Sequence, residues 1–160
     1  MKVVTVAIGW QIYAAMDLKL NITILDTRIK EVEELKKHFG QQQHAIEQLS
    51  LKNKHITGYT WGESVMKEQN YTGAFRYFII SLSSSLQLDS PINVENILLF
   101  IQKIAQNISN HTKCSKEYLQ DVIEADKVIR SLRTFALIED RYKTSYEYIL
   151  SKIEIDDNQK

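Results

Sequence analysis

Histidine and cysteine are the residue types in this 160-residue chain that metal binding or nucleophilic catalysis would use first. Glu34 and His38 are four residues apart, a spacing that places two ligands on one helix face. His111 and Cys114 form an H-x-x-C sequence, but a zinc site takes about four ligands and Cys114 is the only cysteine. We therefore predict no metal site and no cofactor.

Other catalytic arrangements are missing from the sequence. Cys114 could act as a nucleophile only beside a base such as His111, and a lone cysteine is also a common small apolar core residue. The chain contains no phosphate-binding G-x-x-x-x-G-K, no G-x-G-x-x-G, no G-x-S-x-G and no H-E-x-x-H. We predict a protein that is not an enzyme and that works by binding a partner; a small enzyme that uses Cys114 or a histidine is the less favoured alternative.

Charge and composition restrict the partner and the fold class. The 20 basic and 20 acidic residues give a formal charge of zero, so no basic excess exists to neutralise phosphates and nucleic acid is not the expected partner. A hydrophobic fraction of 44% is enough for a core, while one proline and five glycines are too few for the turns of an all-β fold. These values predict an all-α protein.

The N-terminal segment, residues 1–17, is apolar and carries no charge between Val3 and Met16. A membrane-spanning helix needs about 20 apolar residues, so this run is short for a span. Trp10 and Tyr13 are residue types found at membrane interfaces. We favour a membrane anchor or part of one, with a membrane-associated location. A helix buried in the protein's own core or in an oligomer, in a cytoplasmic protein, is the main alternative, followed by a strand or a signal peptide.

Residues 18–50 are predicted to form an amphipathic, coiled-coil-like helix continuous with the apolar segment. Apolar side chains recur at alternating spacings of three and four residues, which places one stripe along a helix. We call this stripe the seam; its residues are Leu18, Ile22, Leu25, Ile29, Val32 and Phe39. The seam predicts either a homo-oligomer or a helix that packs against its own domain. Gly40 and the glutamines 41–43 are expected to interrupt it, and the polar stretch 51–58 is the expected boundary of the next domain.

Residues 58–155 are predicted to form a domain of about five antiparallel helices. A first hairpin, 59–88, divides at Asn70, and Ser90-Pro91 then has the pattern of an N-cap followed by proline at the first helical position. The stretch 94–108 has a strong apolar stripe.

The remaining segments follow the same pattern. Residues 110–114 are expected to be a loop, and Ser115 is expected to cap the next helix. A last helix begins near Ile138, and residues 156–160 are an acidic tail.

The segment from Tyr59 to Leu86 resembles one tetratricopeptide repeat. In this family small and aromatic residues at fixed positions let two helices pack closely. The matching residues are Gly62, Tyr71, Ala74 and Phe78, with Trp61 before the glycine. The chain shows no second repeat at the family's offset of about 34 residues, so it resembles a divergent or minimal member.

The resemblance implies a protein-interaction surface and no catalysis. Members of such families bind through the concave surface lined by their first helices. By this analogy the partner-binding residues are Tyr59, Glu63, Met66 and Lys67. The sequence as a whole therefore predicts an interaction or scaffold protein for a protein partner, tethered to a membrane through its N-terminus. The alternative is a structural protein whose N-terminal helix forms a homo-oligomer interface.

Overall fold

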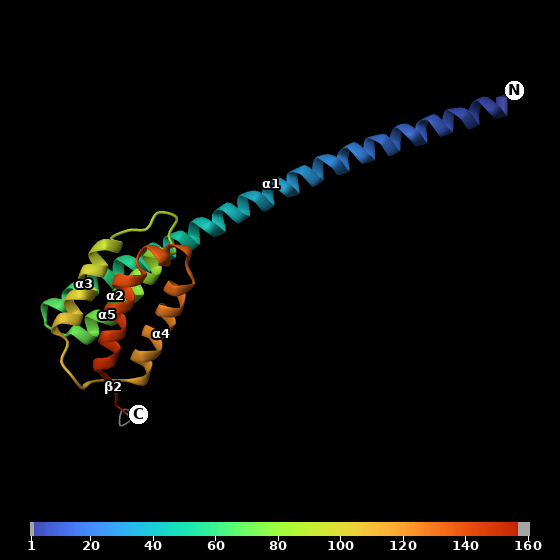
Figure 1. Ribbon diagram of the computed structural model, residues 1–160. Helices are drawn as coiled ribbons and strands as arrows, with labels where there is room; N and C mark the ends of the chain where they lie inside the picture. The colour runs from blue at the N-terminus through green and yellow to red at the C-terminus, as the bar shows by residue number, and fades with distance from the viewer. Residues whose placement is uncertain (1, 157–160) are drawn as a thin grey trace. The chain divides into compact units, whose positions relative to one another are not determined.

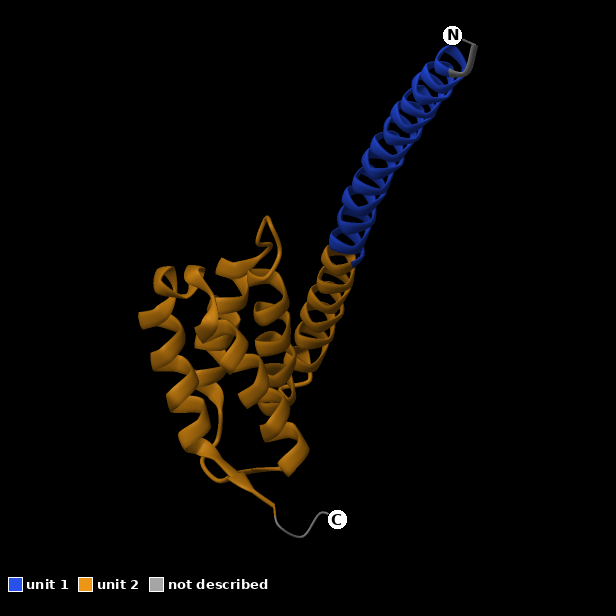
Figure 2. Cartoon of the chain, turned by 90° about the vertical axis from the view of Figure 1, so that its right-hand side faces the viewer, with its two compact units in different colours: residues 1–46 blue, residues 47–160 orange. Residues whose placement is uncertain are grey.

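The computed structural model describes residues 2–156, which are mostly helical (Figure 1). In chain order the elements are α1 Lys2–Lys67, α2 Tyr71–Leu86, α3 Val94–Asn107, β1 Thr112–Cys114, α4 Lys116–Ser131, the 3-10 helix η1 Arg133–Leu137, α5 Glu139–Lys152 and β2 Ile153–Ile155. The prediction of an all-α chain with a long N-terminal helix and about five helices is confirmed. The chain divides into two compact units, residues 1–46 and residues 47–160, which Figure 2 colours separately.

Helix α1 runs without interruption through the positions where breaks were expected. Gly40 lies within the helix, and a side chain there would meet no atom within 4 Å. A helical glycine costs only about 0.5–1 kcal/mol relative to alanine, which the long flanking helical segments offset. The polar stretch 51–58 is also helical, and it contains the buried residues His55 and Gly58. The helix therefore continues through Gly40 and the glutamines, which interrupt the apolar seam but not the backbone. The stretch 51–58 is helical and partly buried, so it is not a break between domains, and the strand alternative for the N-terminal segment is wrong.

Within residues 47–160 the end of α1 packs closely against α2. A Cβ atom on Gly58 would lie 2.9 Å from the backbone oxygen of Tyr77, and one on Gly62 would lie 2.9 Å from the Phe78 ring. Contacts move backward along α2 as they move forward along α1, so the two helices are antiparallel. The close packing expected of Gly62 and Phe78 is confirmed, and it depends on the absence of side chains at two glycines four residues apart.

A buried polar pair joins the same two helices. His55 is only 1% exposed and its Nδ1 lies 2.9 Å from the Ser81 hydroxyl. That hydroxyl donates to the backbone oxygen of His55 at 2.9 Å, so Nδ1 must carry the hydrogen of the bond between the two side chains. Both buried groups are thereby satisfied, which is the condition under which polar side chains are tolerated in a core.

The turn between α1 and α2 is closed by Asn70, as expected from the sequence. Its side chain accepts a hydrogen bond from the Gly73 amide at 2.9 Å and caps α2. The next helix differs from the prediction. Its N-cap is Asn93 in the left-handed conformation, with φ of 56°, and Pro91 lies outside the helix. The Ser85 hydroxyl accepts from the Ile92 amide at 2.8 Å, so the connection is held from α2.

The last part of the chain adds α4, α5 and a short sheet. Ser115 caps α4 as expected, accepting from the Tyr118 amide at 3.2 Å. The predicted loop 110–114 is wrong in part, because β1 pairs in parallel with β2. Thr112 is aligned with Ile153 in this ladder. A strand of three residues is stable only when it is paired. Its partner, β2, follows α4 and α5 in the chain, so the pairing is not visible in the local sequence.

The core surrounds α2, which contacts both α3 and α4, while α3 contacts α5. Phe78 stacks on Phe100 with ring centroids 4.6 Å apart, and Tyr142 stacks on Tyr146 at 5.4 Å. Such pairs add to the free energy gained from burial. The other large side chains that are fully buried in this unit are Phe75, Ile79, Leu82, Ile97, Leu98, Ile101, Ile104, Ile129 and Ile149.

We expect Gly58→Ala to destabilise residues 47–160. The new Cβ would press on the Tyr77 backbone, which cannot rotate away, and overpacking of this kind costs about 1–3 kcal/mol. The measurement is urea unfolding followed by near-UV circular dichroism. Gly40→Ala is the matched control, because its surroundings are open and the substitution favours the helix by about 0.5–1 kcal/mol. A Gly58→Ala protein as stable as the parent would contradict the role given to this contact.

Candidate interaction surfaces

The first candidate surface is the part of α1 that lies in residues 1–46. Every side chain from Val4 to Ile46 is exposed, including large apolar ones such as Trp10 at 71% and Phe39 at 72%. Folded monomers rarely expose contiguous apolar patches larger than a few hundred Å², and larger patches mark interaction sites. In residues 4–46 this helix therefore presents an apolar surface that the segment itself does not cover.

The seam residues all lie on this exposed helix. Their exposed fractions run from 49% at Val32 to 72% at Phe39. The helix brings them into one stripe, as their spacing predicted, because residues three and four apart are neighbours on a helix surface.

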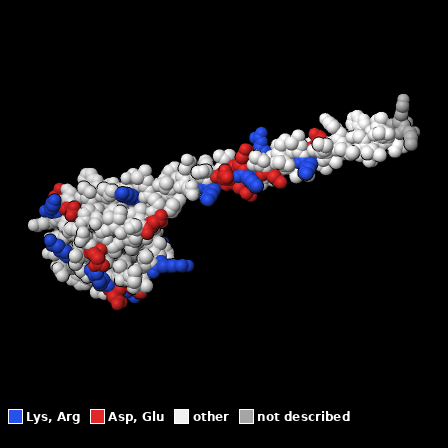
Figure 3. Space-filling view, turned by 90° about the horizontal axis from the view of Figure 1, so that it is seen from above, with Lys and Arg blue, Asp and Glu red and all other residues white. Residues whose placement is uncertain are grey.

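Charges are unevenly distributed along the same helix. Figure 3 shows acidic and basic side chains gathered along the middle of α1, whereas the run from Val3 to Met16 in the sequence carries no charge. Among the residues that the structure describes, no helix is long and apolar enough to cross a membrane.

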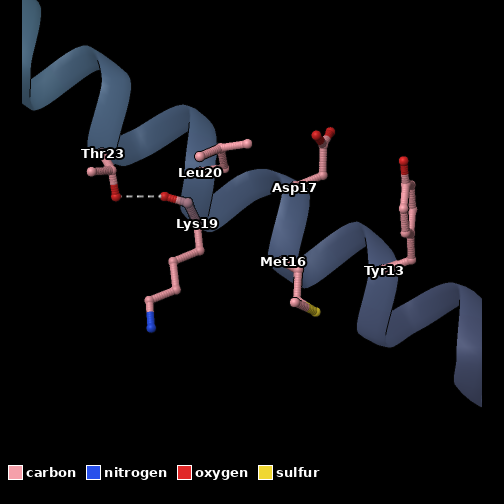
Figure 4. A pocket seen from close by; sticks show the side chains of 6 residues that line it. All are labelled: Tyr13, Met16, Asp17, Lys19, Leu20 and Thr23. Atoms are coloured by element: carbon pink, nitrogen blue, oxygen red, sulfur yellow. Dashed lines mark hydrogen bonds between the residues drawn. The ribbon is translucent and has the colours of Figure 1, made fainter.

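A shallow depression on α1 is lined by residues between Tyr13 and Thr23 (Figure 4). Tyr13 and Asp17 point to one side of the helix, and Met16 and Lys19 point to the other. The Thr23 hydroxyl only donates back to the Lys19 backbone oxygen at 3.0 Å. Because every lining residue comes from this single helix, the depression is an open surface without the opposing wall that a substrate site needs.

The four residues expected to bind a partner do not form one exposed surface. Tyr59 is half-buried and makes edge contacts with Phe78 and Phe100 at 6.1 and 6.0 Å. Burial, with a further contribution from the negative charge of Glu63, raises the pKa of the Tyr59 hydroxyl. Met66 is buried in the core, Glu63 is partly exposed and Lys67 is exposed. Tyr59 and Met66 therefore mainly stabilise the domain.

A groove of about 550 Å³ lies between the end of α1, α2 and α4. Its floor includes Ser83 and Ser84 of α2, both buried, while Lys54 of α1 lines one side. Asp121 and Glu124 line the α4 side, and Asp121 is paired with Arg76. This groove was not predicted from the sequence, because its walls come from three separate helices. The run Ser83–Ser85 within an apolar helix was the one local indication of it.

Cys114 and His111, the residues that nucleophilic catalysis would use, are in surroundings that do not activate a thiol. Cys114 is buried, and burial raises the pKa of its thiol, which disfavours the reactive thiolate. His111 is ion-paired with Glu154. Within residues 2–156 no three histidine, cysteine or acidic side chains come together in a way that could hold a metal ion.

A cluster of titratable residues, with the two tyrosines buried and Arg130 exposed, joins α4 to α5. Asp126 accepts from the Tyr142 hydroxyl at 2.8 Å and from Arg130 Nε at 2.9 Å, and the Arg130 guanidinium lies over the Tyr146 ring. Burial is the main cause that raises the pKa of Tyr142 and of Tyr146, and the charge of Asp126 adds to it. The groups satisfy one another, so the cluster stabilises the domain.

Comparison of the chain with protein-family models, with curated proteins and with solved structures finds no match. The resemblance of residues 59–86 to a tetratricopeptide repeat therefore stays a prediction.

We expect the domain to lose stability as the pH rises above about 10, the ordinary pKa of tyrosine. The raised pKa of Tyr142 means that the unfolded chain releases its proton first, so this stabilisation is complete below about pH 10 and is lost as the pH rises toward the folded-state pKa. Tyr142→Phe should make this alkaline loss shallower. It should also cost about 1 kcal/mol at neutral pH, because the hydrogen bond to Asp126 disappears.

The measurement is the free energy of unfolding in urea at neutral and alkaline pH. Tyr13→Phe is the control, since Tyr13 is 70% exposed. An unchanged pH dependence in the Tyr142→Phe protein would contradict the assignment.

Proposed function

We propose that this protein is a non-enzymatic interaction protein. Residues 1–46 form its association segment, and residues 47–160 form a small helical domain that binds a protein partner. The observation that carries the proposal is the exposed apolar seam of α1.

The energetics of the helix support association. Burying one leucine or isoleucine side chain contributes about 1.5–3 kcal/mol relative to leaving it in water. Most helices in proteins draw their stability from the packing of an apolar face. The seam offers six large apolar side chains that nothing in residues 1–46 covers. A partner surface that covers them would stabilise both the helix and the complex.

The groove on the second unit fits a protein segment. Its serine floor would admit small or flat side chains, because Ser83 and Ser84 project little from α2. The carboxylate of Glu124 on the rim favours a basic residue in the incoming segment, while Lys54 opposite favours an acidic one. The resemblance of residues 59–86 to a tetratricopeptide repeat also supports a protein partner. Gly62 packs closely against Phe78, and close packing of two helices at a small residue is a feature of that repeat.

Membrane attachment is the second candidate for the N-terminal part. The observation that favours it is the uncharged, exposed stretch from Val4 to Met16, with Trp10 and Tyr13 in it. An alkaline carbonate wash of membranes from cells that make the protein tests this candidate. Retention of the protein in the washed pellet would support a membrane anchor, whereas its complete release would exclude this candidate.

Photo-crosslinking in cells tests the proposed function. A photoreactive phenylalanine analogue at Leu25, on the seam, should give a discrete crosslinked protein. The same analogue at Lys54 should report a partner in the groove. Thr27 is the control position, because it lies about 200° around the helix from Leu25. The proposal fails when neither Leu25 nor Lys54 gives a product that Thr27 lacks.

A further inference from the structure

We infer that the seam of α1 binds the seam of a second copy of this chain, and that the two helices form a parallel, in-register, two-stranded coiled coil. The inference rests on the proposed function and deepens it by naming the partner of the association segment.

The residue types along the seam select the number of strands. In a heptad, written a to g, the seam spacing places Ile22 and Ile29 at a, and Leu18, Leu25, Val32 and Phe39 at d. In the first two heptads isoleucine at a is combined with leucine at d, which favours two parallel strands, whereas isoleucine at both positions favours three or four. The six side chains are between 49% and 72% exposed, so they are available to a second helix.

The charges beside the seam select the orientation and the register. Arg28 lies at position g and Glu33 lies at the e position five residues later. In a parallel, in-register pair, g of one helix faces e of the following heptad on the other, so Arg28 faces Glu33 of the second copy. The symmetry makes this contact twice. An antiparallel pair joins g with g and e with e, and it would not bring Arg28 to Glu33. Such e and g pairs set partner choice and orientation in coiled coils.

The ends of the seam limit the paired region. The same register continues upstream with Ala15 and Ile8 at a. Downstream, Lys36 occupies an a position, where a single polar residue lowers stability but restricts register and oligomer order. Beyond Phe39 the next a position is Gln43, so the apolar contact weakens there. The coiled coil therefore occupies the half of α1 that precedes the helical domain.

Sedimentation equilibrium of the purified full-length protein tests the inference. The expected mass is twice 18.6 kDa. Arg28→Glu and Glu33→Arg should each weaken the dimer about tenfold, because each replaces two attractive contacts by repulsive ones. The double variant Arg28→Glu/Glu33→Arg restores opposite charges and should return the dissociation constant close to that of the parent. Glu34→Arg, the same charge change one residue away on the outer face, is the control and should change little.

Cysteine crosslinking checks the orientation. In a background that carries Cys114→Ala, Leu25→Cys should form a disulfide-linked dimer under mild oxidation, since equivalent d positions face each other only when the helices are parallel and in register. Thr27→Cys lies on the outer face and should not.

Three outcomes would overturn the inference: a monomer at all concentrations, a double charge variant no tighter than the single variants, or crosslinking no greater at Leu25 than at Thr27. A purified monomer that still crosslinks through Leu25 to another protein in cells would leave the proposed function intact and replace the second copy by that partner. If the purified protein is a monomer and Leu25 gives no crosslink in cells either, residues 1–46 are not an association segment.

Discussion

The close approach of α1 to α2 is the constraint on which the rest of the helical domain depends. Without side chains at Gly58 and Gly62 the two backbones come near enough for the His55 ring to reach Ser81. The two kinds of contact determine different parts of the geometry. The glycines determine the distance between the helices, and the buried hydrogen bonds determine the position of one helix along the axis of the other. The aromatic rings of Tyr59, Phe78 and Phe100 then fill the space beside that interface.

The same packing separates the two roles of α1. Its last turns supply core side chains such as Met66, so they are held in one arrangement by α2. The side chains of residues 4–46 are exposed, so the apolar face of this segment is stabilised only when another surface covers it. Helix α1 is nevertheless unbroken, and no change in backbone conformation separates its exposed first part from the last turns that pack against α2.

The residue pattern within a short window was sufficient to predict the elements that are stabilised by neighbouring residues. The stripe of apolar residues in α3, the division of the hairpin at Asn70 and the cap Ser115 were predicted correctly, because the buried face and the first turn of a helix are encoded within a short window of sequence. The strand β1 and the groove were missed because each depends on groups from distant parts of the chain, and no window of neighbouring residues contains both partners. The N-cap Asn93 was missed for another reason: Ser90-Pro91 has the usual pattern of a helix start, whereas Asn93 is in the left-handed conformation and caps the helix without a side-chain hydrogen bond. Likewise, Tyr59 and Met66 could not be told apart from surface residues without knowing where α2 and α3 pack.

The pairing of β1 with β2 also determines when the domain can be completed. The ladder joins Thr112 to Ile153 and Cys114 to Ile155, so it encloses all of α4 and α5 in one closed loop of chain. Closing a loop of that length lowers the conformational entropy of the chain, and the contacts between β1 and β2 form only after this cost. During biosynthesis α4 and α5 can dock as they emerge, but this pairing has to wait until Ile153–Ile155 have been made. Without those residues the edge of β1 would be open to pair with another molecule.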